Sequence, residues 1–232
     1  QYLLVTSDRQ EATGKSVYPW TGQKFSDLFL FSKTGNLLTP FDPVINTEHN
    51  EGTPVFTNNF LTMYFTRCQR DNNENDDCKI MVSYLEDGAW TDPETLPFTK
   101  PNVQFGHPAL LENDSILVFT SDLESPGGNF DLYYTELFED GSWADPEKMP
   151  STINTNGNEK FPVADGDTLY FSSDYLPGMG GYDIFKTFLT KDRKWAAPVN
   201  MKYPVNSGGD DFSYVVDKTF KTNANKTGKP NE

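Results

Sequence analysis

Histidine, cysteine and long apolar runs are scarce in this 232-residue sequence. Two histidines and two cysteines leave little material for a zinc site, and none of the GxSxG, HExxH or CxxC signatures of hydrolases and zinc proteins occurs. No apolar run approaches the roughly 20 residues that a membrane-spanning helix needs. We therefore expect no catalytic residue, no cofactor, no metal and no direct insertion into a membrane.

Positively charged residues are also few. The chain has 19 Lys and Arg against 34 Asp and Glu, a formal net charge of −15. Nucleic-acid binding draws much of its affinity from Lys and Arg that neutralise phosphates, so nucleic acid is a poor partner for this chain. The sequence begins at Gln1 without a charged-then-apolar signal segment, and we expect it to be a processed or excised piece.

Helical periodicity is missing, whereas aromatic and turn-forming residues are abundant. Aromatic residues make up 14% of the chain, and 17 Gly and 16 Pro are distributed along it. This composition favours short strands joined by turns. A hydrophobic content of 36% over this length is enough for one substantial core. The composition predicts a single all-β domain over residues 1–232.

An internal repeat organises the chain. The segment FEDGSWADPEKMP at Phe138 to Pro150 closely matches LEDGAWTDPETLP at Leu85 to Pro97. Tryptophans recur at intervals of 53 and 52 residues, and two sets of prolines keep a similar period. These positions are Trp90, Trp143 and Trp195, then Pro40, Pro93, Pro146 and Pro198, then Pro54, Pro108 and Pro162. Periods of this length indicate solenoids, propellers or arrays.

Each repeat contains four short strand patterns. In the second copy they cover Thr53–Thr57, Thr62–Arg67, Lys79–Leu85 and Ala89–Leu96. Four antiparallel strands per unit are typical of a β-propeller blade. The repeats occupy approximately residues 1–50, 51–104, 105–158 and 159–209, with a partial copy at 210–232. The pattern of Asp211 to Val216 predicts a first strand. We expect four blades if this strand completes the first blade and closes the ring, and five or more if the sequence is a fragment.

Two residue types recur at fixed places in the repeat. The tryptophans follow an Asp-Gly or similar turn, and we expect them to fill the gaps between blades rather than to bind a ligand. Second strands end in an aspartate at three places, which are Asp8, Asp122 and Asp174. A carboxylate there can accept N–H groups of the following loop. We expect these aspartates to be structural rather than catalytic.

The two cysteines, Cys68 and Cys78, are ten positions apart. A hairpin whose arms end at these residues would bring them within bridging distance, and Cys68 stands where other repeats have the strand-end aspartate. We expect a disulfide, which places the chain in an oxidising extracytoplasmic compartment. The alternative is two unpaired thiols in a reducing cell.

Several segments carry a resemblance to a known family. They are the first-strand prolines, FTSD at Phe119–Asp122, FSSD at Phe171–Asp174, and GGYDIF at Gly180–Phe185. The chain resembles the WD40-like β-propeller repeats of Gram-negative periplasmic proteins. More narrowly, VYPWTGQKFSDLFLFS at Val17–Ser32 is similar to the propeller of Bacteroidetes outer-membrane-associated proteins with an OmpA-like domain, such as the PorE-like components of the type IX secretion system. The chain departs from the generic repeat at Cys68 and over Asp211–Glu232.

The resemblance implies a function and a location. It implies a non-catalytic scaffold or protein-interaction module in the periplasm, associated with the outer membrane. Its partners would be envelope proteins such as secretion-system components, and peptidoglycan would be bound only through other domains of the full-length protein. Within the chain, the long insertion Arg9–Asp27 carries Tyr18, Pro19 and Trp20 as a candidate interaction loop, because a loop aromatic is a typical binding hot spot. Alternatively, this loop covers its own blade.

Three chemical alternatives remain to be weighed. His49 and His107 precede first strands in neighbouring repeats, without the motifs of a catalytic histidine. Asp71–Asp77 begins like a calcium loop but has Asp76 where glycine should stand, so a solvated loop tip fits better. A glycan-binding or glycan-hydrolysing propeller with carboxylates and aromatics at the channel mouth is the alternative function. It is weakened because Gly88 and Gly141 do not have the spacing of a sialidase Asp-box.

Overall fold

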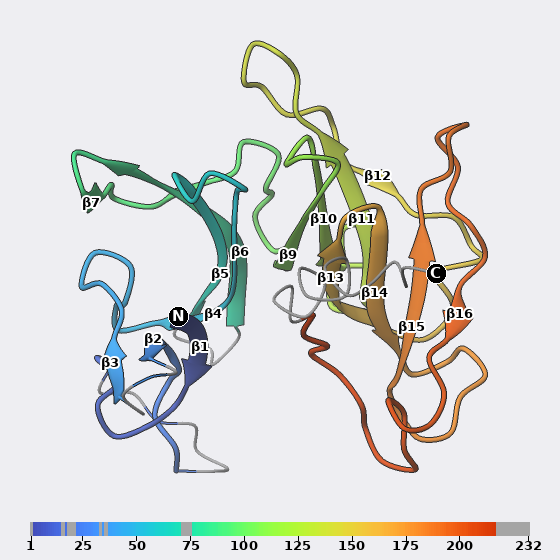
Figure 1. The fold of residues 1–232 in the computed structure, drawn as a ribbon, viewed down its shortest axis with the longest axis horizontal. Coiled ribbons are helices and arrows are strands. Elements are labelled where there is room, and N and C mark those ends of the chain that lie inside the picture. Colours follow the sequence, from blue (N-terminus) through green and yellow to red (C-terminus); the bar gives the residue numbers. More distant parts are fainter. Residues whose placement is uncertain are drawn as a thin grey trace, which may run out of the picture.

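The protein is described by a computed structural model that covers residues 2–14, 17, 22–32, 34, 37–70 and 76–216. It consists of four small antiparallel sheets arranged as a four-bladed β-propeller (Figure 1). The all-β prediction and the propeller prediction are therefore confirmed. No helix long and apolar enough to cross a membrane occurs in the part of the chain that the structure describes.

The described strands fall into four blades. Blade 1 contains β1 (Tyr2–Ser7), β2 (Asp27–Ser32) and β3 (Leu37–Pro40). Blade 2 contains β4 (Asn50–Phe56), β5 (Thr62–Arg70), β6 (Asp76–Glu86), β7 (Ala89–Trp90) and β8 (Glu94–Thr95). Blade 3 contains β9 (Phe105–Leu111), β10 (Ile116–Ser121), β11 (Asp131–Glu136) and β12 (Glu147–Lys148). Blade 4 contains β13 (Glu159–Asp165), β14 (Thr168–Ser173), β15 (Asp183–Phe188) and β16 (Val199–Asn200).

Blade 1 differs from the others at its inner edge. In blades 2 to 4 the first strand pairs with the second, as β4 does with β5. β1 corresponds to these second strands and pairs with β2, but no described strand pairs with its other edge. The segment 211–216, predicted to be a first strand, lies against blade 4 without strand hydrogen bonding to β1. The remainder of the partial copy, residues 217–232, lies outside the described residues.

The outermost strands are shorter than the sequence predicted. The single strand expected over Ala89–Leu96 is split into β7 and β8, which both pair with β6. Proline in this strand removes a hydrogen-bond donor, and the ladder is interrupted before it. The turn before it forms as expected, because Asp87 (φ 49°) and Gly88 (φ 84°) both adopt the left-handed conformation of a tight hairpin turn.

Among the described residues the core contains three apolar clusters, one at each interface between consecutive blades. A tryptophan lies in each interface. Trp143 meets Tyr64 of blade 2 edge-on at 6.0 Å between ring centroids, and Trp195 meets Tyr134 of blade 3 at the same distance. Trp90 contacts Phe41 of blade 1. Each tryptophan therefore joins its own blade to the one before it.

The cysteines and aspartates singled out in the sequence lie at the ends of the second strands. Cys68 and Cys78 face each other across the β5–β6 ladder and form a disulfide. Asp122 follows β10, where its two carboxylate oxygens accept the N–H groups of Gln104 and Gly127, each at 2.7 Å. Asp174 follows β14 and accepts the N–H and the side-chain amide of Asn158. Asp8 directly follows β1. These groups therefore sit where hairpin loops begin.

Candidate functional site: the axial channel

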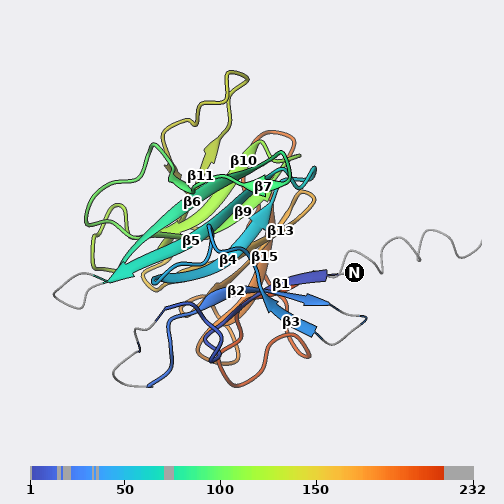
Figure 2. The same cartoon turned by 90° about the vertical axis from the view of Figure 1, so that its left-hand side faces the viewer.

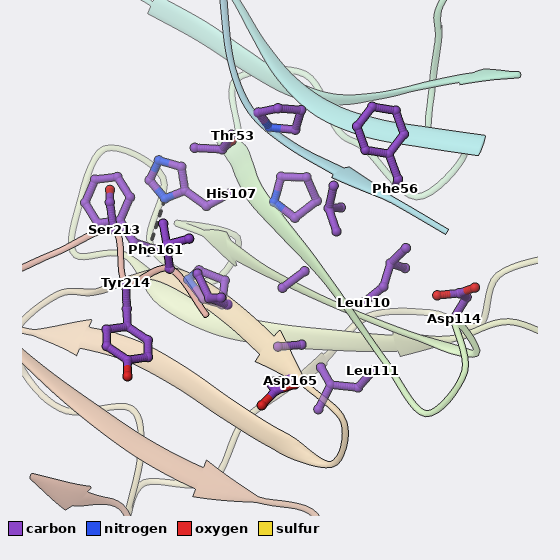
Figure 3. A pocket seen from close by; sticks show the side chains of 18 of the residues that line it. Thr53, Phe56, His107, Leu110, Leu111, Asp114, Phe161, Asp165, Ser213 and Tyr214 are labelled. Carbon is purple, nitrogen blue, oxygen red and sulfur yellow. Dashed lines mark hydrogen bonds between the residues drawn. The ribbon is translucent and has the colours of Figure 1, made fainter. Parts of the chain in front are cut away.

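The inner strands of the propeller surround a cavity of about 700 Å³ (Figure 3). Its walls come from β1, β4, β9, β13 and residues 213–215. Most of its lining side chains are apolar, and they include Val55, Leu110, Leu111, Val163, Ala164 and Val215. Concave apolar sites of this size, with a few polar groups, are the usual form of a ligand site. We therefore take this axial channel as the candidate functional site.

A residue with left-handed backbone recurs in the strands of the channel wall. Thr53, His107 and Phe161 each precede the first-strand proline and have φ values of 49°, 52° and 53°, and Ser213 repeats the conformation at 58°. The sheet register shifts at the same place in β4, β9 and β13, which identifies a β-bulge. Left-handed backbone at a non-glycine residue costs on the order of 1 kcal/mol or more. The surrounding structure must offset this cost at every blade.

Hydrogen bonds between blades supply part of that compensation. The N–H of Thr53 donates to Thr6 Oγ1 at 3.3 Å, and the N–H of His107 donates to Thr66 Oγ1 at 2.8 Å. Within blade 2, Thr53 Oγ1 lies 2.7 Å from Thr66 Oγ1, which links the two bonds between blades. The N–H of Phe161 donates to His107 Nδ1 at 3.4 Å. The polar groups at the middle of the channel are thus engaged in joining one blade to the next.

His107 is the titratable group at the centre of the wall. Its ring stacks on Phe161 with centroids 4.2 Å apart, and Phe161 stacks on Phe212 at 5.1 Å. Burial, with a smaller contribution from the nearby Lys160 ammonium, lowers the pKa of His107 to about 4. The imidazole is neutral at neutral pH, which its role as a hydrogen-bond acceptor requires.

Carboxylates gather at one end of the channel. Glu112 and Asp114 come from the β9–β10 turn, Asp165 is the last residue of β13, and Asp167 lies in the β13–β14 turn. Figure 3 shows Asp114 and Asp165 at the end away from His107 and Thr53. Asp114 accepts the N–H of Asn58 at 2.7 Å, and Glu112 pairs with Arg193.

No lysine or arginine lines the channel among the described residues. The ionised side chains of the lining are therefore carboxylates, of which Glu112 is paired with Arg193 from outside the lining, and the apolar walls concentrate their electrostatic field. Within the same described ranges, no group of three or more His, Cys, Asp or Glu side chains is arranged to hold a metal ion.

The residues singled out from the sequence mostly lie elsewhere. Tyr18, Pro19 and Trp20 fall outside the described residues, as do Asp71 to Asn75 of the predicted loop tip. The strand-end aspartates and the repeat tryptophans do not line the channel, whereas His107 does. Sequence reasoning missed the bulges and the turn carboxylates. The sequence signal that could have located them is the 54-residue spacing of Pro54, Pro108 and Pro162, which marks the inner strands.

Comparisons with known proteins show the fold alone. The chain matches no protein-family profile and no curated protein. It is similar in fold to an α-L-arabinofuranosidase from Lactobacillus brevis, with 12% identity, a TM-score of 0.50, and coverage of 87% of this chain and 74% of that one. A putative TolB from Agrobacterium tumefaciens gives 15% identity, a TM-score of 0.48, and coverage of 82% and 62%.

A puromycin-hydrolysing peptidase from Mycobacterium tuberculosis gives 13% identity, a TM-score of 0.45 and coverage of 76% of this chain. The present chain spans 27% of that peptidase and 62% of the putative TolB. The class that the fold and the channel define is a β-propeller domain.

Proposed function

We propose that this chain is a non-catalytic, protein-binding propeller of a cell-envelope complex. The observation that carries the proposal is the axial channel, whose apolar walls can receive a partner while its central polar groups are occupied by hydrogen bonds between blades. The Cys68–Cys78 disulfide supports an oxidising, extracytoplasmic location, because such bonds persist outside the reducing cytosol.

The repeat motifs suggest a more specific setting. Their resemblance to periplasmic WD40-like repeats supports a periplasmic scaffold associated with the outer membrane, in the type IX secretion system. Its partners would be envelope proteins, and peptidoglycan would be bound through other domains of a longer protein. Tyr18, Pro19 and Trp20 remain a predicted second contact, because loop aromatics commonly anchor interfaces.

Cross-linking tests this proposal. The purified domain is cross-linked in envelope extracts, and cross-linked peptides are identified by mass spectrometry with wild type, Trp20→Ala and a control. Tyr203→Ala is the control, because Tyr203 is 80% exposed and far along the chain from the loop. We expect cross-links to defined envelope proteins that weaken with Trp20→Ala and persist with Tyr203→Ala. A domain that cross-links to no envelope protein would contradict the proposal.

A glycan-active propeller is the second candidate. The observation that favours it is the set of four carboxylates in the channel lining, because glycosidases use paired carboxylates. Arabino-oligosaccharides and peptidoglycan fragments are incubated with wild type and with Asp114→Asn. Hydrolysis, or saturable binding that this substitution abolishes, would establish this function and displace the first. If none of the oligosaccharides or fragments is hydrolysed or bound, the protein-binding proposal stands.

A further inference from the structure

The joints between consecutive blades share a hydrogen bond at the left-handed residue of the inner strand. The N–H of Thr53 in blade 2 donates to Thr6 Oγ1 of blade 1, and the N–H of His107 in blade 3 donates to Thr66 Oγ1 of blade 2. In both joints the acceptor is a threonine hydroxyl on the second strand of the preceding blade. This hydroxyl therefore fixes the position of the next inner strand.

The joint between blades 3 and 4 departs from this pattern. Phe161 is the left-handed residue of blade 4, and Thr120 of β10 is the corresponding threonine of blade 3. The Phe161 N–H donates instead to His107 Nδ1 at 3.4 Å, longer than a typical bond of roughly 2.7–3.2 Å (Figure 3). Thr120 Oγ1 is buried without a hydrogen-bond partner among the described residues, which is destabilising. One N–H group thus has two acceptors nearby, one used and one idle.

A change from glycine to lysine explains why the threonine is idle. The residue before the left-handed position is Gly52 in blade 2 and Gly106 in blade 3, but Lys160 in blade 4. A Cβ at Gly106 would lie 3.2 Å from Thr66 Cγ2 and 3.3 Å from its Oγ1, closer than ordinary van der Waals contact. Lys160 carries such a Cβ opposite Thr120. Its strand is therefore held further from the hydroxyl than the inner strands of the other blades.

The two acceptors respond differently to pH. A neutral imidazole accepts through one nitrogen, but both nitrogens are donors once the ring is protonated, whereas a threonine hydroxyl accepts at any pH. Burial, with a smaller contribution from the Lys160 ammonium, lowers the pKa of His107 to about 4. Acid therefore removes the acceptor that Phe161 uses and leaves Thr120 Oγ1 as the alternative.

Lys160 of β13 is the charged group that acts on His107. Asp114 and Asp165 lie at the other end of the channel (Figure 3). Further charged groups on the elements packed around β9 have partners of their own and are not among the causes of the lowered pKa. They are Glu51 of β4, Arg67 of β5, Lys79 of β6, Glu159 of β13, and Asp211.

We propose that the joint between blades 3 and 4 is a proton-controlled latch, in which the Phe161 N–H donates to His107 Nδ1 while the imidazole is neutral and to Thr120 Oγ1 once Nδ1 carries a proton. β13 lies beside β9 and β10 (Figure 1 and Figure 2), so the exchange draws β13 toward β10 and moves Phe161 in the channel wall. Arg193 pairs with Glu112 and Glu136 of blade 3 and keeps the two blades joined. The latch needs no partner and does not depend on the proposed function.

NMR titration of the ¹⁵N-labelled chain from neutral pH to about pH 3 tests the latch. Thr120→Val removes the idle acceptor, so the protonated form loses its hydrogen bond while the neutral form keeps its own. The midpoint of the His107 imidazole titration should fall by about 0.5–1 pH unit. Thr120→Ser keeps the hydroxyl and should keep the wild-type midpoint. The midpoint of His49 is the internal control and should be the same in all three proteins.

Amide exchange gives a second readout of the same variant. Below the His107 midpoint, the Phe161 N–H should exchange with solvent faster in Thr120→Val than in wild type, because no acceptor remains for it. Above the midpoint the two proteins should have similar rates.

Two variants of Lys160 test the other side of the latch. Lys160→Gly restores the glycine of blades 2 and 3, so the Phe161 N–H should reach Thr120 Oγ1 at every pH. The change in its amide shift across the His107 titration should then fall to about half of the wild-type change or less. Lys160→Gln removes the charge but keeps the Cβ, and it should retain the wild-type change.

Specific outcomes would overturn the latch. They are equal His107 midpoints in wild type and Thr120→Val, equal exchange of the Phe161 N–H in these two proteins in acid, and a Phe161 shift that follows the titration as strongly in Lys160→Gly as in Lys160→Gln. Unfolding of wild type before His107 takes up a proton would also overturn it, because the second position would then never form.

Discussion

Asn154 satisfies both backbone groups of Leu132 in the neighbouring strand. Its Oδ1 accepts the Leu132 N–H at 2.8 Å, and its Nδ2 donates to the Leu132 carbonyl at 2.9 Å. Asn46 makes the same pair of bonds with Leu28, and Asn206 with Ile184. All three asparagines are buried. A side-chain amide thus takes the place of a strand residue at the point where the chain passes to the next blade.

Asn154→Ala should lower the free energy of unfolding by about 2–4 kcal/mol, because two buried backbone groups lose their partners. Asn206→Ala should have a similar effect. Urea denaturation measures it, with Lys191→Ala as an exposed control expected to stay within about 0.5 kcal/mol of wild type. If Asn154→Ala is as stable as the control, the bonds contribute little.

Replacing both Cys68 and Cys78 with Ser should lower the free energy of unfolding by about 3 kcal/mol, the value for closing a loop of this size in the unfolded chain. Denaturation with and without reductant measures the effect, and reductant should not change the stability of the variant. A version with Cys68→Asp and Cys78→Ser restores the aspartate of the other repeats and should recover part of the loss. Equal stability of wild type and the double Ser variant would contradict the expectation.

Trp143→Ala should lower the free energy of unfolding by about 3 kcal/mol, since it leaves a cavity between blades 2 and 3 and removes the edge contact with Tyr64. Trp143→Phe keeps most of the apolar volume and should cost less than half as much. Thermal and chemical denaturation report both values. Similar losses for Ala and Phe would show that the indole itself, rather than its packing volume, matters.

His107 should make stability depend on pH. Its folded-state pKa of about 4 lies below the value of about 6.5 in an unfolded chain, so the unfolded chain binds the proton first as pH falls. Its contribution to stability is therefore full above pH 6.5 and is lost progressively as pH falls to about 4.

His107→Asn removes this titration while keeping a side chain that tolerates a left-handed backbone. Between pH 6.5 and 4, wild type should lose about 1–3 kcal/mol more stability than the variant. The buried Glu51 and Glu159 have raised pKa values and titrate in both proteins, so their effect cancels in the difference. His49→Gln is the control, and parallel pH profiles for wild type and His107→Asn would refute the expectation.

The sequence alone determined the propeller and much of its local chemistry. Period, strand length and turn type are properties of contiguous residues, so the repeated Asp-Gly-x-Trp segments and first-strand prolines were enough to predict four-stranded blades. The disulfide was also predictable, because Cys68 and Cys78 flank one hairpin. The Asn154 bond to Leu132 was not predicted, although asparagines at positions 46, 154 and 206 precede Thr or Ser in each case.

Only the tertiary structure decided what the channel is made of. Its walls join residues from β1, β4, β9 and β13, which are about one repeat apart in sequence and meet only when the blades pack. The left-handed backbone at Thr53, His107 and Phe161 runs against local preference, so it forms only where bonds between blades compensate for it. That no described strand pairs with the second edge of β1 is likewise decided by the tertiary structure, because pairing depends on which strand lies beside it in space.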